Sequence, residues 1–369
     1  MTKLKKITYG LDDVGIVQAP ISFTNHRKDV NPFIEVCGRE MYPIFASPME
    51  SVIDEHNYKT FIEHKITPVI PRTVQQRLSL DERLELAKDT FVSFSLAEAQ
   101  ELYGTNKFEN LLSPVYICVD MAHGTLSSLY DTCGMIKHQY GNKVVIMTGN
   151  VNTPLAYVYY VDAGIDYLRL SIGTGSRCTT SCAVGCHSGT ATLIDEICEE
   201  RDRWISEHPN KPYTKIIVDG GIDWYDKIQK SIALGADGVM VGKLFAECEE
   251  ACGAIEYAFS EEDFINGISY TEDKYKKLWE GLKVPIYPFR MYRGMSHRSS
   301  QKLMGGDGSK VSEGICKPVK VKYPLSHWVN NMDAYLRSIM TYTDSRCIED
   351  LKNAEVVILG GIGKMAYAK

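Results

Sequence analysis

The sequence predicts an α/β fold, a closed (β/α)8 barrel of the TIM type. Short apolar runs rich in β-forming residues alternate with amphipathic stretches of helical length. Directly after these runs stand Gly, Ser, Asp and Cys, the residue types that form sites at the carboxyl ends of barrel strands. With 369 residues, 44% of them hydrophobic, the chain is long enough to bury the core of such a barrel.

Eight apolar runs predict eight strands, and eight repeats favour a closed barrel over an open sheet. The expected strands lie within 43–49, 66–72, 90–96, 114–124, 143–151, 167–173, 215–222 and 235–243. Apolar positions near a 3.6-residue period predict helices between them. The clearest helical stretches are 75–89, 127–141, 191–208 and 224–235.

The segment after the eighth unit differs from the repeats. Residues 285–322 are polar, basic and glycine-containing without periodicity, which predicts a long mobile flap beside the active site. A further helix is expected over 326–345 and a closing apolar segment over 355–361, and the glycine cluster 360–365 predicts an ordinary turn. We therefore expect one barrel domain over 1–369.

Charge and cysteine content narrow the function. The net charge is −6 and no block of Lys and Arg stands out, which argues against nucleic-acid or membrane-surface binding but allows a small anionic ligand. The sequence contains no signal-peptide core and no apolar stretch of about 18 residues. Eleven scattered cysteines fit reduced thiols better than disulfides. We therefore expect a cytoplasmic, soluble protein.

The segment after the sixth strand, residues 171–189, carries the strongest chemical signal. Gly173 and Gly175 permit a tight turn with exposed amides, and Ser176 adds a hydroxyl. Cys178 follows Arg177, a cation that favours the nucleophilic thiolate. From this segment alone, a nucleophile and an incidental cysteine in a loop stay equally open.

The same segment allows a metal cluster, because Cys178, Cys182, Cys186 and His187 recur at about four-residue spacing. Structural zinc sites usually combine two separate pairs of ligands, and the sequence has no second pair. A zinc site is therefore the less favoured reading.

The seventh and eighth strands end in Asp219-Gly220-Gly221 and Gly242-Lys243. Loops after these strands often bind phosphate through backbone amides and a helix N-terminus, and a helix is expected to begin near Leu244. The Asp219 carboxylate suits two sugar hydroxyls, although it could instead cap the next turn. Other strand ends supply further candidates: Ser47, Met49, Asp120, His123 and Asn150.

Seven motifs in order resemble the IMP dehydrogenase/GMP reductase family, from about Gly10 to Lys320. They are ASPM, VDMAHG, TGNV, SIGTGSRCTT, VDGGI, GADGVMVG and MYRGM. The resemblance implies that Cys178 forms a covalent adduct at the purine C2 and that Asp219 holds the ribose. It implies that the nucleotide and its phosphate are held by Ser47, Met49, Ser176, Gly220, Gly221, Gly242, Lys243, Tyr292, Gly294, Met295 and Ser296.

The resemblance also implies a cofactor and partners. A nicotinamide cofactor, NADPH or else NADH/NAD+, would lie beside the base and contact Asp120, Ala122, Asn150 and Gly173. Backbone carbonyls of Gly173, Gly175 and Cys178 could hold a monovalent cation such as K+. The expected partner is a purine nucleoside monophosphate, and the expected assembly is a homotetramer.

Three observations favour the reductase direction. No regulatory domains are inserted after the second strand, and the stretch between Met295 and Glu313 lacks the Arg-Tyr pair with which the family's dehydrogenases activate water. The flap ends in Ser312-Glu313-Gly314, as in reductases, where a Thr and this Glu serve the departing ammonia; here these are Thr180 and Glu313.

The sequence therefore predicts NADPH-dependent reductive deamination of GMP, or of a close deoxy or modified guanine nucleotide, to IMP and ammonia. VDMAHG is closer to bacterial dehydrogenases, so oxidation of IMP to XMP with NAD+ stays an alternative. A purine-nucleotide-binding protein without catalysis is a second alternative.

Five positions depart from the family's usual pattern. Ser171 stands where Gly is usual, Thr174 where Pro is usual, and Ser181 where Arg usually follows Cys-Thr-Thr. Lys243 replaces a small residue beside the phosphate, and Pro71 replaces a His. Lys243 could add a positive charge to phosphate binding or point into solvent.

Overall fold

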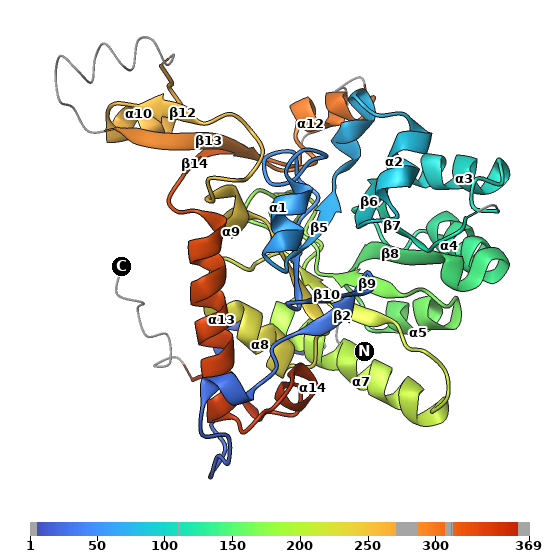
Figure 1. Ribbon diagram of the computed structural model, residues 1–369, viewed down its shortest axis with the longest axis vertical. Helices are drawn as coiled ribbons and strands as arrows, with labels where there is room; N and C mark the ends of the chain where they lie inside the picture. The colour runs from blue at the N-terminus through green and yellow to red at the C-terminus, as the bar shows by residue number, and fades with distance from the viewer. Residues whose placement is uncertain (1–5, 110, 271–285, 307–310, 312, 361–369) are drawn as a thin grey trace.

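The computed structural model describes residues 6–109, 111–270, 286–306, 311 and 313–360. Eight parallel strands close into a barrel in the order β10-β11-β4-β5-β6-β7-β8-β9 (Figure 1). Each lies inside one of the eight predicted runs, which confirms the (β/α)8 barrel. The strands are β4 Ile44–Ala46, β5 Thr67–Ile70, β6 Phe91–Phe94, β7 Val115–Asp120, β8 Val144–Val151, β9 Tyr167–Leu170, β10 Lys215–Asp219 and β11 Gly238–Val241.

Helices surround the barrel, and the four clearest helical predictions are confirmed. The stretch 75–89 forms a shorter helix, α2, because Ser79 caps it: the Ser79 hydroxyl accepts from the Glu82 amide and the Glu82 carboxylate accepts from the Ser79 amide. The main helices are α1 Tyr58–Glu63, α2 Leu80–Leu86, α3 Leu96–Gly104, α4 Ser127–Tyr140, α5 Leu155–Asp162, α7 Thr190–Glu207, α8 Tyr225–Ala233 and α13 Leu325–Tyr342.

The barrel interior contains one buried apolar layer to which every strand contributes. Its members are Phe45, Val69, Phe91, Cys118, Met147, Tyr167, Ile217 and Met240. Val36 and Met41, from the hairpin of β2 Ile34–Val36 and β3 Arg39–Met41, pack against this layer. Because side chains alternate along a strand, the residues two positions later point inward one layer nearer the carboxyl ends. Those positions include three of the polar candidates, Ser47, Asp120 and Asp219.

The segment after β11 contains regular structure that the sequence did not predict. A three-stranded antiparallel sheet of β12 Glu256–Ala258, β13 Tyr287–Arg293 and β14 Cys316–Lys320 projects from one end of the barrel (Figure 1). With it lie α10 Glu261–Asn266 and α12 Arg298–Leu303. The expectation of an irregular flap over 285–322 is therefore wrong for β13, α12 and β14.

Arg290 explains how this sheet is held. Its buried guanidinium donates to the carbonyls of Ala246 at 2.9 Å and Glu249 at 3.2 Å, and also to that of Cys248. These carbonyls lie at the end of α9, Lys243–Ala246, which follows the eighth strand. A basic residue at the C-terminal end of a helix satisfies carbonyls that have no partner within the helix. The sheet is thereby fixed to the last barrel unit.

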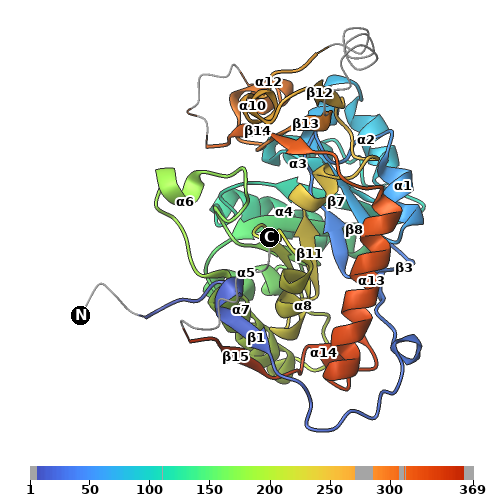
Figure 2. The ribbon, with the colours of Figure 1, turned by 90° about the vertical axis from the view of Figure 1, so that its left-hand side faces the viewer.

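The first and last described strands pair at the opposite, amino-terminal end of the barrel. β1 Val14–Ile16 pairs antiparallel with β15 Val356–Ile358, and the two strands lie side by side in Figure 2. β15 confirms the closing segment expected over 355–361. The turn expected over 360–365 lies, apart from Gly360, outside the described residues.

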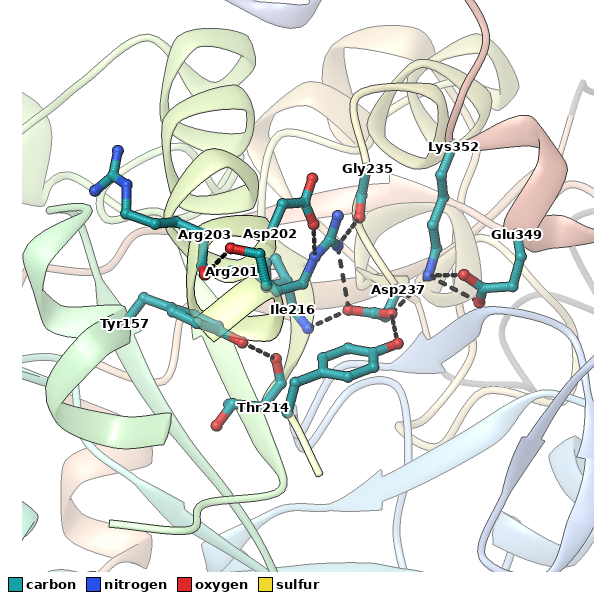
Figure 3. Close-up of polar contacts among 12 residues, drawn as sticks. Tyr157, Arg201, Asp202, Arg203, Thr214, Ile216, Gly235, Asp237, Glu349 and Lys352 are labelled. Carbon is teal, nitrogen blue, oxygen red and sulfur yellow. Dashed lines mark hydrogen bonds and ion pairs between the residues drawn. The ribbon is translucent and has the colours of Figure 1, made fainter. Parts of the chain in front are cut away.

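Asp237 connects several elements at this end of the barrel through hydrogen bonds and ion pairs (Figure 3). Its buried carboxylate accepts from the Ile216 amide at 2.7 Å and from the Tyr213 hydroxyl at 3.1 Å. It forms ion pairs with Lys352, just after α14 Ile348–Leu351, at 2.7 Å and with Arg201 at 3.8 Å. Contacts at this face of a barrel contribute stability rather than chemistry.

All eleven cysteines are free thiols, as expected from their irregular spacing. Within the described ranges, the chain offers no helix of the length and apolarity needed to cross a membrane.

We expect Asp237→Asn to lower the free energy of unfolding by about 3 kcal/mol, because two buried cations then keep only exposed carboxylates, Asp202 beside Arg201 and Glu349 beside Lys352. Urea unfolding followed by circular dichroism measures this loss. Glu349→Gln is the matched control: it removes the other carboxylate on Lys352, and because the Glu349 side chain is 66% exposed, the change should cost about 1 kcal/mol or less. Equal losses in both variants would contradict the assignment.

Candidate active site

Arg169, on β9, forms the floor of the candidate site. Its side chain is 6% exposed and lies between two carboxylates, Asp120 at the end of β7 and Asp219 at the end of the adjacent strand β10. It donates to Asp120 Oδ1 at 2.6 Å and to Asp219 Oδ2 at 2.6 and 3.1 Å. Gly149 leaves room for it, because a Cβ there would lie 2.8 Å from the Arg169 Cβ.

The charges of this cluster depend on one another. Burial alone would raise the pKa of Asp120, but Arg169 and the nearby Arg72 outweigh it and hold that pKa below its usual value. Burial would likewise lower the pKa of Arg169, but Asp219 and Asp120 raise it well above its usual value. Asp120 and Arg169 therefore stay ionised at neutral pH.

Asn150 connects this floor to the catalytic loop, by which we mean residues 171–181. Its amide nitrogen donates to Asp219 Oδ2 and to the Ser171 carbonyl, both at 2.9 Å. Asp120, Asn150 and Asp219, chosen from the sequence as separate strand-end candidates, thus lie in one hydrogen-bonded cluster.

Cys178, Thr180 and Glu313 form a second connected group. The Cys178 thiol donates to Thr180 Oγ1 at 3.2 Å, and the Thr180 hydroxyl donates to Glu313 Oε2 at 2.6 Å. Thr180 begins the short helix α6, Thr180–Ala183, while Glu313 arrives from the segment before β14. The arrangement allows a proton to pass between sulfur and carboxylate through one hydroxyl.

Backbone pairing holds these two segments together. Cys178 and Gly314 form an antiparallel bridge, in which the Thr179 amide donates to the Glu313 carbonyl at 2.7 Å and the Ile315 amide to the Arg177 carbonyl at 3.0 Å. Glu313 is therefore positioned by main-chain hydrogen bonds, not by its side chain alone.

Several residues assigned to the phosphate from the resemblance converge at the end of β11. A Cβ on Gly242 would lie 2.6 Å from Tyr292 Oη, 3.1 Å from Met49 Sδ and 3.4 Å from Ser47 Oγ. Burial raises the pKa of Tyr292, whose hydroxyl contacts Met49 Sδ at 3.2 Å and also the Ser176 side chain. Tyr292 therefore remains a neutral hydrogen-bond donor.

Gly220 and Gly221 lie against the catalytic loop. Both have positive φ, +108° and +76°, and a Cβ on Gly220 would lie 2.5 Å from Thr174 Oγ1. Lys243 begins α9 at the predicted position, within one residue, and is half-buried. It makes no ion pair with any residue that the structure describes.

Residues 294–296 pack against the catalytic loop and against the residues just before β14. The Gly294 amide donates to the Ile315 carbonyl at 3.1 Å, and a Cβ on Gly294 would lie 2.5 Å from the Arg177 carbonyl. Ser296 lies close to Gly314, whose added Cβ would be 3.1 Å from the Ser296 carbonyl carbon. Met295, which lies between them in the sequence, is half-buried. Gly294 and Ser296 therefore lie beside Arg177 and Gly314, which adjoin Cys178 in the sequence and in the antiparallel bridge.

The residues expected to bind the cofactor have acceptor atoms to offer. Among the described residues, Asp120 Oδ2 is approached by Arg72 Nε at 3.5 Å, and the two hydrogen bonds of the Asn150 side chain use its nitrogen. Ala122 is exposed in the loop after β7, and Gly173 is half-buried. The carboxamide of a nicotinamide needs hydrogen-bond acceptors for its two N–H groups, and the oxygens of Asp120 and Asn150 fit that need.

The backbone carbonyls expected to bind a monovalent cation do not fit one as well. The Gly173 carbonyl accepts the Ser181 hydroxyl at 2.9 Å, and the Gly175 carbonyl accepts the Cys178 amide at 2.9 Å. The zinc alternative also lacks support. Among the described residues, which include Cys182, Cys186 and His187, no three His, Cys, Asp or Glu side chains gather around a metal position.

Comparison with known proteins identifies the family. Residues 106–361 match the model of the IMP dehydrogenase / GMP reductase domain. The chain belongs to this family. The resemblance, and with it the expectation of an oxidoreductase of the IMP dehydrogenase/GMP reductase family, is therefore confirmed.

Individual relatives carry both names. The chain is 29% identical to a GMP reductase of Clostridium acetobutylicum over 86% of this chain and 85% of that protein. It is 26% identical to a GMP reductase of Oceanobacillus iheyensis over 95% of each chain. It is 30% identical to an inosine-5′-monophosphate dehydrogenase of Mycobacterium tuberculosis over 65% of this chain but 42% of that protein.

The sequence analysis missed Arg169, although a signal was present. Arg169 interrupts the apolar strand Tyr-Leu-Arg-Leu, two residues after an inward-facing Tyr167 and two before Ser171. A charged residue at an inward position of a barrel strand must have a counter-charge nearby, and the strand-end aspartates supply it. Arg72 was missed because it follows β5 in a 3-10 turn, η3 Arg72–Gln76.

We expect Arg169→Met to lower the free energy of unfolding by about 3–5 kcal/mol at neutral pH, because two buried carboxylates lose their cation. In the wild type the lowered pKa of Asp120 contributes stability above about pH 4, which is lost as pH falls through its folded pKa. Without Arg169, burial raises that pKa instead.

The difference between Arg169→Met and wild type should therefore grow from pH 5 to pH 7.5 (about one to four units above the unfolded pKa), as measured by urea unfolding at each pH. Arg169→Lys is the control, because it keeps a positive charge between the carboxylates. A difference that does not change with pH would contradict the ionised cluster.

Proposed function

We propose that the protein catalyses the NADPH-dependent reductive deamination of GMP, or of a close guanine nucleotide, to IMP and ammonia. The observation that carries this proposal is the hydrogen-bonded series from Cys178 through Thr180 to Glu313. An amine leaves a purine only after it is protonated, and this series connects a nucleophile to a proton store.

The first step follows from that geometry. Glu313 takes the Thr180 proton as Thr180 takes the thiol proton, and the Cys178 thiolate forms a C–S bond at the purine C2. The same proton then returns through Thr180 to the amino nitrogen, and the C–N bond breaks to release ammonia, which takes one proton from solvent and leaves as ammonium.

The second step restores the sulfur. A reduced nicotinamide, when bound, supplies hydride to C2. The C–S bond then breaks, its electron pair returns to Cys178, which takes the second proton from solvent, and IMP leaves. The balance is GMP, NADPH and two protons in, and IMP, NADP+ and ammonium out.

The remaining residues fit roles in binding. Every hydrogen bond that Asp219 accepts from the described residues ends on Oδ2, which leaves Oδ1 to accept from a ribose hydroxyl. Ser47, Ser176, Gly242 and Tyr292 surround the position assigned to the phosphate. Neutral hydroxyls and backbone amides at a helix start suit a phosphate monoester.

Two further observations support the reductase direction over the dehydrogenase. β5 leads directly through η3 and α2 to β6, with no inserted domain. The two reductases match over 85% and 95% of their own lengths, whereas the dehydrogenase from M. tuberculosis matches over 42% of its length.

We expect the wild-type protein to consume NADPH in the presence of GMP and to release one ammonia per NADPH, followed by near-ultraviolet absorbance and an ammonia assay. Cys178→Ala should abolish turnover. Thr180→Val and Glu313→Gln should each lower kcat by about 10²–10⁴-fold, because the proton path is interrupted.

Thr180→Ser is the matched control, because it keeps a hydroxyl between Cys178 and Glu313 and should retain most of the activity. Turnover of IMP with NAD+ and none of GMP would overturn the proposal in favour of the dehydrogenase. A panel of ribo- and deoxynucleotides, with products identified by mass spectrometry, tests the substrate at the same time.

Gly242→Ala should raise KM for the nucleotide about tenfold with a smaller change in kcat, because its Cβ would displace Tyr292 from the phosphate position. Steady-state kinetics with varied nucleotide measure both constants. Gly134→Ala is the control: its Cβ would meet only Ala163 Cβ at an ordinary 3.7 Å. An unchanged KM in Gly242→Ala would place the phosphate elsewhere.

A further inference from the structure

Three hydroxyl side chains form hydrogen bonds within the catalytic loop. Ser171, Thr174 and Ser181 stand where the family pattern usually has Gly, Pro and Arg, so they are properties of this chain. Ser171 and Thr174 share a hydrogen bond of 2.7 Å, and Ser181 donates to the Gly173 carbonyl at 2.9 Å. All three departures thus have a partner inside the loop or its turn.

Ser181 closes the turn from the side of α6. Gly173 has φ of +77°, and a Cβ there would lie 2.6 Å from the Ser181 amide nitrogen. The start of α6 therefore packs directly on the turn, and the Ser181 hydroxyl reaches back to the carbonyl of Gly173. The Cys178 amide closes the adjoining turn, from Gly175 to Cys178, by donating to the Gly175 carbonyl.

Ser171 is held in an unfavourable conformation. Its φ is +85°, a region that costs a non-glycine residue about 1–3 kcal/mol. Glycine would avoid this cost, so the serine hydroxyl must contribute an interaction that glycine lacks. Its hydrogen bond orients Thr174, whose Oγ1 fills the space above Gly220: a Cβ on Gly220 would lie 2.5 Å from it.

We propose that these hydroxyls take over the role of a monovalent cation, so that the catalytic loop of this chain is ordered without one, with Ser181 as the decisive positioning residue. The proposal rests on the proposed function only in naming Cys178 as the nucleophile whose position matters.

At the Gly173 carbonyl, a hydroxyl hydrogen can do what a bound cation would do. A cation held by converging carbonyls neutralises the repulsion between their oxygen lone pairs. The Ser181 hydroxyl places a partly positive hydrogen on the same oxygen, and it is covalently part of the loop. The Gly175 carbonyl is satisfied by the Cys178 amide. Within the described chain, two of the three carbonyls expected to bind the cation are therefore already occupied by donors.

The test compares potassium chloride with tetramethylammonium chloride at equal ionic strength. The first readout is the rate at which iodoacetamide alkylates Cys178, resolved from Cys182 and Cys186 by tandem mass spectrometry, which requires no substrate. The second is kcat with GMP and NADPH. We expect both to differ by less than about twofold between the salts in the wild type, because the hydroxyl hydrogen bond already orders the loop.

Ser181→Ala should alkylate at Cys178 about tenfold faster in tetramethylammonium, because the loop loses one hydrogen bond and opens. Potassium should restore the slow rate, because the Gly173 carbonyl is vacated for it. Ser181→Thr is the matched control: it keeps the hydroxyl and should behave as the wild type in both salts. Ser171→Gly, which relieves the backbone cost but removes the other hydroxyl, should show a smaller shift in the same direction.

Three results would overturn the proposal: a wild type that potassium changes tenfold or more, a Ser181→Ala variant indistinguishable from wild type, or a Ser181→Ala variant that potassium does not restore. The alkylation readout separates this failure from that of the proposed function. If GMP is not turned over but alkylation follows the expected pattern, only the assigned reaction fails.

Discussion

The site depends on one guanidinium placed inside a barrel. Arg169 occupies the first layer above the apolar interior, and its burial is tolerable only because Asp120 and Asp219 approach it from the two sides. The carboxylates are equally dependent on it. Three strands, β7, β9 and β10, are thus set in register by charge at their carboxyl ends, where packing of small apolar residues gives little specificity. The positions assigned to cofactor and ribose follow from that register.

The catalytic loop is built outward from this floor in short steps. Asn150 joins Asp219 to the Ser171 carbonyl, Ser171 orients Thr174, and the turn that follows presents Cys178 to Thr180. Each step is a hydrogen bond between residues close in space, so small displacements of the floor would reach the thiol. The hydroxyls of Ser171, Thr174 and Ser181 add hydrogen bonds within the loop itself.

The sequence was sufficient to predict the barrel and to select candidate residues that the structure brings to one end of it, but insufficient to predict how those residues connect. Periodicity located all eight strands because each buried strand is a short apolar run. It missed β13, whose alternation is masked by Arg290 and Arg293, basic residues that reach back to buried carbonyls and to Glu50. It also missed β14, whose five residues include two lysines and a proline. Arg169 escaped notice for the same reason as β13. Long-range partners of buried cations leave no local pattern.

The antiparallel sheet also joins the two halves of the chemistry. β13 carries Arg290, anchored at α9, and two residues later Tyr292, which lies at the phosphate position. β14 pairs with β13 along five residue positions and is preceded by Glu313. If Tyr292 holds the phosphate, as we propose, the same hairpin connects phosphate binding to Glu313, the carboxylate of the proposed proton path to Cys178.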